Sequence, residues 1–141
     1  MYSSLILAVS NLFGLSCLNK AINNKEINSF IVIYLIIISS FLMHLTESKH
    51  DYIPFIFIDY SYFFLWIDRI ITAISILYFL PIYIKKDRDS KRFVNILGIF
   101  GLFCLYAGET KTNDEFFNYI VYPFLHLIWH ACIYISIYIV I

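Results

Sequence analysis

The sequence predicts an all-α fold, a polytopic membrane helix bundle with about five transmembrane helices. Three observations predict it. The chain of 141 residues is 61% hydrophobic and only 14% charged, its mean hydropathy is +0.78, and its apolar residues form long runs between short polar breaks. One small water-soluble domain cannot bury so much apolar surface. No repeat or low-complexity linker divides the chain, so residues 1–141 are expected to form a single transmembrane helical domain.

The first two apolar runs are Met1–Asn19 and Ile27–Leu45. The first contains no charged residue and ends at the polar segment KAINNKE, residues 20–26. Because it has neither a basic start nor a clear small-residue cleavage site, we expect a retained helix rather than a signal peptide. The second run carries one ionisable group, His44.

The third run, Asp59–Ile84, follows a polar connector that closes at Pro54, and it is interrupted by the dipeptide Asp68-Arg69. Pro81 lies near its end, where a proline is expected to kink or fray the last helical turn.

The fourth and fifth runs follow two further polar segments. The cluster KKDRDSKR, Lys85–Arg92, is expected to be a solvated loop. The fourth run, Phe93–Gly108, then has 16 residues, which is at the short limit for crossing a hydrocarbon layer of ~30 Å. The fifth run, Phe116–Ile141, has 26 residues and contains two histidines.

Strands are the competing assignment, because Ile, Tyr and Phe are abundant and favour strands. A membrane barrel needs segments of about ten residues that alternate polar and apolar positions. These runs are apolar at nearly every position, so helices are favoured. The ten basic and ten acidic residues balance, which gives no indication of nucleic acid as a partner.

The basic residues predict an orientation. In a five-span chain, the loops after the first and third spans lie on the same side and hold seven of the ten: Lys20, Lys25, Lys85, Lys86, Arg88, Lys91 and Arg92. The opposite side holds Lys49 and Lys111. The positive-inside rule therefore places the N-terminus on the lumenal or extracellular side and the C-terminus in the cytoplasm, in an endomembrane or in the plasma membrane.

Ionisable residues within membrane spans are costly unless they pair, bind a metal or face water. His126 and His130 are four residues apart and share a helix face, and Ser40 and His44 have the same spacing on the second span. With alternating helix directions, His44, Asp68 and the histidine pair all fall in the leaflet on the N-terminal side. Three imidazoles and a water match catalytic zinc, so we predict a Zn²⁺ site.

At these residues the chain resembles the CREST superfamily of alkaline ceramidases, adiponectin and progestin receptors and transmembrane protein 8 proteins. The order is SxxxH, then Asp, then a C-terminal HxxxH. The transmembrane protein 8 branch, which includes myomaker, is the closer likeness: SSFLMHLTESKH and DYSYFFLWIDRI are followed by an acidic loop and HLIWHAC. The resemblance implies that His44, His126 and His130 ligate zinc, and that Ser40 and Asp68 contact the metal-bound water.

The chain is shorter than this family. Its members have seven membrane helices, and the loop Lys85–Arg92 stands here where two further helices would be expected. Loss of an adjacent antiparallel pair preserves the direction of later helices, and it could leave a lipid-binding cavity open on one flank. The family includes ceramide and phospholipid hydrolases, receptors and a cell-fusion protein, so the likeness does not fix a function.

Two functional classes follow from the sequence. One is a zinc-dependent amidase or esterase that acts on a membrane lipid. The other is a non-catalytic protein, receptor-like or fusion-related, with a structural zinc site. A haem ligated by His44 and one of the paired histidines is a minor alternative. Asp68 has a simpler interpretation as an ion pair with Arg69, and His50 is expected to be solvated.

Overall fold

In the computed structural model of the chain, the described residues are 3–46, 61–110 and 114–141. Every regular element within these ranges is helical. Five helical segments, of 19, 20, 23, 21 and 24 residues, are long and apolar enough to cross a membrane. This result confirms the all-α class and the five spans, and it indicates an integral membrane protein.

The first span consists of three consecutive pieces, α1 (Ser3–Ser10), the 3₁₀ turn η1 (Asn11–Phe13) and α2 (Gly14–Asn23). The helix continues to Asn23, past Asn19, where the sequence predicted its end. Two polar side chains near this end, Lys20 and Asn24, form hydrogen bonds with the C-terminal end of the chain. Lys20 Nζ donates to the Tyr138 carbonyl at 2.5 Å. Asn24 Nδ2 donates to the Ile141 carbonyl at 3.1 Å.

The next two spans are α3 (Ile27–Thr46) and α4 (Ser61–Ile84). They pack against each other, and α4 continues through Pro81 to Ile84. The start predicted for the third run, Asp59, lies outside the described residues. Ser29 Oγ on α3 lies 3.0 Å from the hydroxyl oxygen of Tyr78 on α4, so a hydrogen bond joins the two helices.

The fourth span, α5 (Arg88–Gly108), begins five residues before the predicted Phe93, so the expected loop Lys85–Arg92 was wrong from Arg88 onward. Asp87 caps this helix: its carboxylate accepts hydrogen bonds from the Ser90 backbone N–H at 2.8 Å and from the Ser90 hydroxyl at 2.6 Å. These two bonds, the side-chain bond first, lower the pKa of Asp87. With 21 residues, the span is no longer short for a membrane.

The last span comprises a π-helical turn, η4 (Phe117–Val121), and α6 (Tyr122–Val140). It packs most extensively against α5. Gly101 permits this approach, since a Cβ there would lie 3.0 Å from Cys132 Cβ and 3.0 Å from the Trp129 ring. A π-helical turn commonly accompanies a functional site, and this one directly precedes the helix with His126 and His130.

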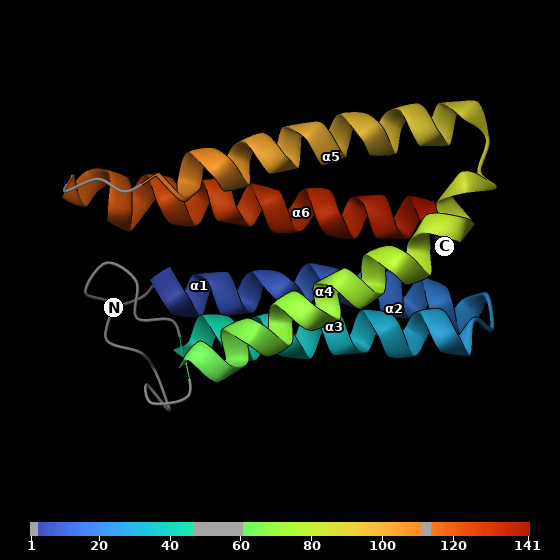
Figure 1. Cartoon of the computed structure of the whole chain (residues 1–141), viewed down its shortest axis with the longest axis horizontal. Helices are drawn as coiled ribbons and strands as arrows, with labels where there is room; N and C mark the ends of the chain where they lie inside the picture. The colour runs from blue at the N-terminus through green and yellow to red at the C-terminus, as the bar shows by residue number, and fades with distance from the viewer. Residues whose placement is uncertain (1–2, 47–60, 111–113) are drawn as a thin grey trace.

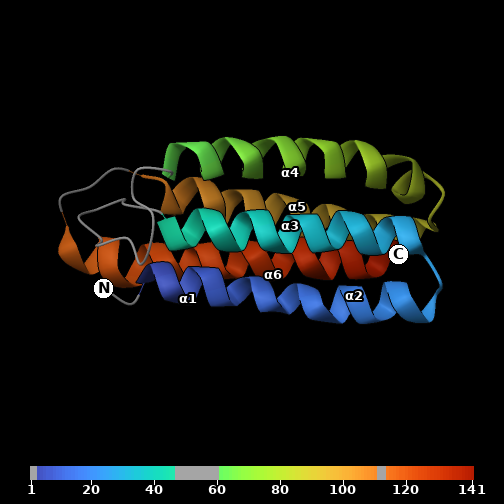
Figure 2. The same cartoon turned by 90° about the horizontal axis from the view of Figure 1, so that it is seen from below.

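The bundle has α6 near its centre, in contact with the first span and α5 and, to a small extent, α4 (Figure 1). Turned by 90°, it shows α4 on one face and the first span on the opposite face (Figure 2). Two interfaces, α3 with α4 and α5 with α6, are extensive, and α4 and α5 are not closely packed against each other.

Candidate metal centre

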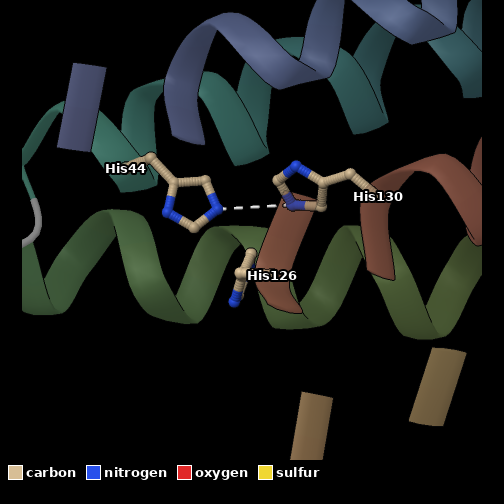
Figure 3. A group of neighbouring side chains, drawn as sticks. All are labelled: His44, His126 and His130. Atoms are coloured by element: carbon tan, nitrogen blue, oxygen red, sulfur yellow. Dashed lines mark hydrogen bonds between the residues drawn. The ribbon is translucent and has the colours of Figure 1, made fainter. Parts of the chain in front are cut away.

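Three histidines from two helices meet inside the bundle. His44 lies in the last turn of α3, and His126 and His130 lie one turn apart on α6. Their side chains are 0%, 6% and 4% exposed, respectively. The sequence predicted that these three residues would lie at one depth in the membrane. In the structure, one ring nitrogen of each histidine lies within 4.8 Å of a ring nitrogen of each of the other two. Figure 3 shows the rings of His44 and His130 directed at each other, with His126 beside them.

The separation between His44 and His130 fits two ligands of one small ion. Their Nε2 atoms are 3.4 Å apart, which is long for a hydrogen bond. Two nitrogens that each bind a tetrahedral ion at ~2.05 Å are separated by about 3.3 Å. A bis-histidine haem would require nitrogens on opposite sides of a flat macrocycle, about 4 Å apart. The separation of this one pair is therefore closer to that of two ligands of a single ion than to that of two axial haem ligands.

The rings meet edge to face. His44 and His126 have centroids 4.8 Å apart with an interplanar angle of 87°, and His126 and His130 have centroids 4.8 Å apart at 82°. The ring nitrogens of all three lie within 4.8 Å of one another. The three histidines thus form a group that could hold a metal ion.

The histidines line a cavity of about 630 Å³ in volume. Its lining residues come mainly from α3, α4 and α6, with Leu105 of α5 and Asn11 of the first span. Apolar surface predominates in the lining, although many of the lining side chains carry a polar atom: Asn11, Ser40, His44, Asp68, Arg69, Thr72, Glu109, His126 and His130, with three tyrosines and Trp129. Such a lining suits an apolar molecule that carries one polar region.

Asp68 faces this cavity from α4, and Ser40 faces it from α3. The hydroxyl of Ser39, the neighbour of Ser40, donates to Asp68 Oδ1 at 3.1 Å. No ion pair between Asp68 and Arg69 occurs among the described residues. The guanidinium of Arg69 instead lies 6.0 Å from the centre of the Trp66 ring, at the outer limit of a cation–π contact. The simpler interpretation of Asp68, an ion pair with its neighbour, is therefore not supported.

Two polar residues of the first span, which the sequence reasoning passed over, lie against the site. Ser10 Oγ is 2.5 Å from His130 Nδ1, and Asn11 Oδ1 accepts a hydrogen bond from the Tyr134 hydroxyl at 2.9 Å. Both side chains are buried. The available signal was a Ser-Asn pair between two apolar stretches, residues 5–9 and 12–15, since polar residues inside a span commonly hydrogen-bond to another helix. His50, expected to be solvated, lies outside the described residues.

The chain was also compared with other proteins. Comparisons with protein-family models, with curated proteins and with solved structures found no match.

Proposed function

We propose that this chain is an integral membrane hydrolase that holds Zn²⁺ between His44, His126 and His130 and cleaves an ester or amide bond of a membrane lipid. The observation that supports it best is the meeting of three buried histidines at the wall of a large apolar cavity that Asp68 also lines. Three imidazoles with a free fourth position are typical of catalytic zinc. Structural zinc sites, in contrast, use four protein ligands.

The side chains around the histidines suit such a reaction. Zinc bound there would polarise a substrate carbonyl and activate water for attack. Asp68, held in position by its hydrogen bond from Ser39, would take the proton from the attacking water and pass it to the leaving nitrogen or oxygen as the scissile bond breaks. The hydroxyl of Ser40 would donate a hydrogen bond to the oxygen on which negative charge develops.

The shape of the cavity supports a lipid as the ligand. Its volume of about 630 Å³ is in the range of pockets that enclose small organic ligands. Residues of α4 and Leu105 of α5 both line it, and these two helices are not closely packed. An acyl chain could therefore extend between them towards the bilayer, while the polar linkage remains beside the histidines.

We further propose that the chain is a shortened member of the CREST superfamily. Support comes from the motif order Ser40/His44, Asp68, His126/His130, and from the cavity that brings these residues together. The sparse packing between α4 and α5 falls at the place in the chain where the family has two further helices. The excess of basic residues near Lys85 supports a cytoplasmic position for that loop and a site in the outer or lumenal leaflet.

The test is lipid hydrolysis by the purified protein in bilayer nanodiscs, with zinc measured in the same samples. Radiolabelled ceramide and phosphatidylcholine are offered separately, and released fatty acid is counted. Asp68→Asn removes the proton acceptor but keeps the size of the side chain, so hydrolysis should fall by roughly 10² to 10⁴-fold while zinc content stays near that of the parent. His130→Ala should lose both zinc and hydrolysis.

Asp89→Asn is the matched control, because Asp89 is an exposed carboxylate in the first turn of α5, away from the cavity. It should leave hydrolysis and zinc unchanged. Should the parent protein hold zinc and release no fatty acid from any tested lipid, the site is structural and the receptor-like or fusion-related alternative replaces the hydrolase.

A further inference from the structure

The hydroxyl group of Ser10 makes two short polar contacts. Its oxygen lies 2.6 Å from the Leu7 carbonyl oxygen and 2.5 Å from His130 Nδ1. A hydroxyl has one proton to donate and can also accept. A carbonyl oxygen can only accept, so the proton between Ser10 and Leu7 must come from Ser10. The contact with His130 must then be made by a proton on Nδ1.

We infer that Ser10 is a positioning residue, which holds His130 in the tautomer with its proton on Nδ1 and its lone pair on Nε2. An uncharged imidazole carries one proton, so fixing it on one nitrogen frees the other as a ligand. The nitrogen freed here is the one that lies 3.4 Å from His44 Nε2. The hydroxyl of the first span thereby directs a lone pair into the space between the histidines.

The local structure of the first span fixes Ser10 in this position. The helix tightens into a 3₁₀ turn directly after Ser10, and such a change within a helix often marks a functional point. On the next turn, Gly14 lets the span approach closely, since a Cβ there would lie 2.6 Å from Ile37 Cδ1 and 2.7 Å from Tyr134 Cε1. The bond from Tyr134 to Asn11 ties the same turn to α6.

The effect of Ser10 on zinc affinity rests on the proposed metal site, whereas its effect on the His130 tautomer does not. Partners that orient a metal-binding histidine typically contribute 10–100-fold to metal affinity, and this contribution exists only if the metal binds. The tautomer of His130 is a property of the metal-free protein. It can therefore be measured even if no metal binds.

The tautomer is read by nitrogen NMR of the metal-free full chain labelled with ¹⁵N-histidine in nanodiscs, because protonated and unprotonated ring nitrogens have distinct chemical shifts. The His130 signals, assigned by their loss in His130→Asn, should show a protonated Nδ1 and an unprotonated Nε2. In Ser10→Ala the proton should move to Nε2 in a large share of molecules. Ser10→Thr retains a hydroxyl and should restore the original tautomer.

Ser75→Ala is the matched control. Ser75 is also buried and donates to a carbonyl three residues earlier, that of Thr72 at 2.7 Å, but on α4. It should change neither the tautomer nor zinc affinity. Zinc affinity, measured by competition with a chelator for Zn²⁺ alone, should fall by roughly 10 to 100-fold in Ser10→Ala and recover in Ser10→Thr.

A wild-type His130 protonated on Nε2 would overturn the inference, and so would an unchanged tautomer in Ser10→Ala. Because the first of these results needs only the wild-type protein, an unstable variant cannot hide a failure. If the wild type shows the Nδ1 proton but takes up no more zinc than His130→Ala, the proposed metal site fails and the role of Ser10 in fixing the tautomer stands.

Discussion

The Ser39 hydroxyl on α3 donates to the Asp68 carboxylate on α4, with 3.1 Å between Oγ and Oδ1. This bond joins two helices at the cavity wall, so it both orients the carboxylate and stabilises its charge. Ser39→Ala should lower lipid hydrolysis by about 10-fold or more, since a hydrogen bond to a charged group contributes about 1.5–3 kcal/mol. Zinc content should not change, because Ser39 is not a ligand. Hydrolysis assays with matched zinc analysis check this result, and equal rates for variant and parent would show that the bond has no catalytic role.

Removal of any one of the three histidines should release most of the metal. Alanine at His44, His126 or His130 leaves two imidazoles, fewer than the three protein ligands of a catalytic zinc site. Metal analysis of the purified variants gives the stoichiometry, and X-ray absorption of the parent should show nitrogen ligands at ~2.0 to 2.1 Å. His50→Ala is the control and should bind zinc as the parent does. Equal zinc in all four variants would mean that the metal binds elsewhere.

Two glycines in membrane spans should respond in opposite ways to alanine. Gly14→Ala places a methyl group within 2.7 Å of Ile37 and Tyr134, and overpacking of this kind typically costs about 1–3 kcal/mol. The displaced Tyr134 would also disturb Asn11 and Ser10. Gly98→Ala meets no atom within 4 Å and should be neutral or slightly stabilising. Thermal denaturation in detergent compares the two, and a Gly14→Ala protein as stable as Gly98→Ala would contradict the close approach of the first span.

The two ends of α5 should be reached from opposite sides of the membrane. Lys85→Cys and Thr110→Cys place exposed thiols just beyond the helix ends. A membrane-impermeant maleimide applied to sealed cells or vesicles should label Thr110→Cys from the outer or lumenal side, and Lys85→Cys only from the cytoplasmic side. The native Cys17, Cys104 and Cys132 are buried, so the parent protein should give little background. Labelling of both variants from one side would show that α5 does not cross.

The sequence predicted the helices well because hydrophobicity over a long run is a strong signal. It located the ends less well, since these depend on single contacts. The sequence predicted a charged loop at residues 88–92. These residues are helical because the Asp87 side chain caps the helix by accepting a hydrogen bond from the Ser90 backbone N–H. The sequence correctly placed His126 and His130 on one helix face, because a spacing of four residues on a helix is enough to put two side chains on the same face.

Contacts between spans could not be predicted in the same way. Ser10 and His130 are separated by 120 positions, and their contact depends on how the first span packs against α6. Ser39 and Ser40 are adjacent and identical, so the sequence could not tell which of the two would bind Asp68. It is the rotation of α3 against α4 that selects Ser39 for the hydrogen bond.

For the proposed hydrolase, the sparse packing between α4 and α5 also determines how activity should be measured. A ligand that arrives sideways from the bilayer never dissolves in the aqueous phase. The quantity that governs its arrival is then its mole fraction among the surrounding lipids, not its amount per volume of buffer. Dilution of the substrate with inert lipid should slow turnover, while dilution of the whole suspension with water should leave the turnover per protein molecule unchanged.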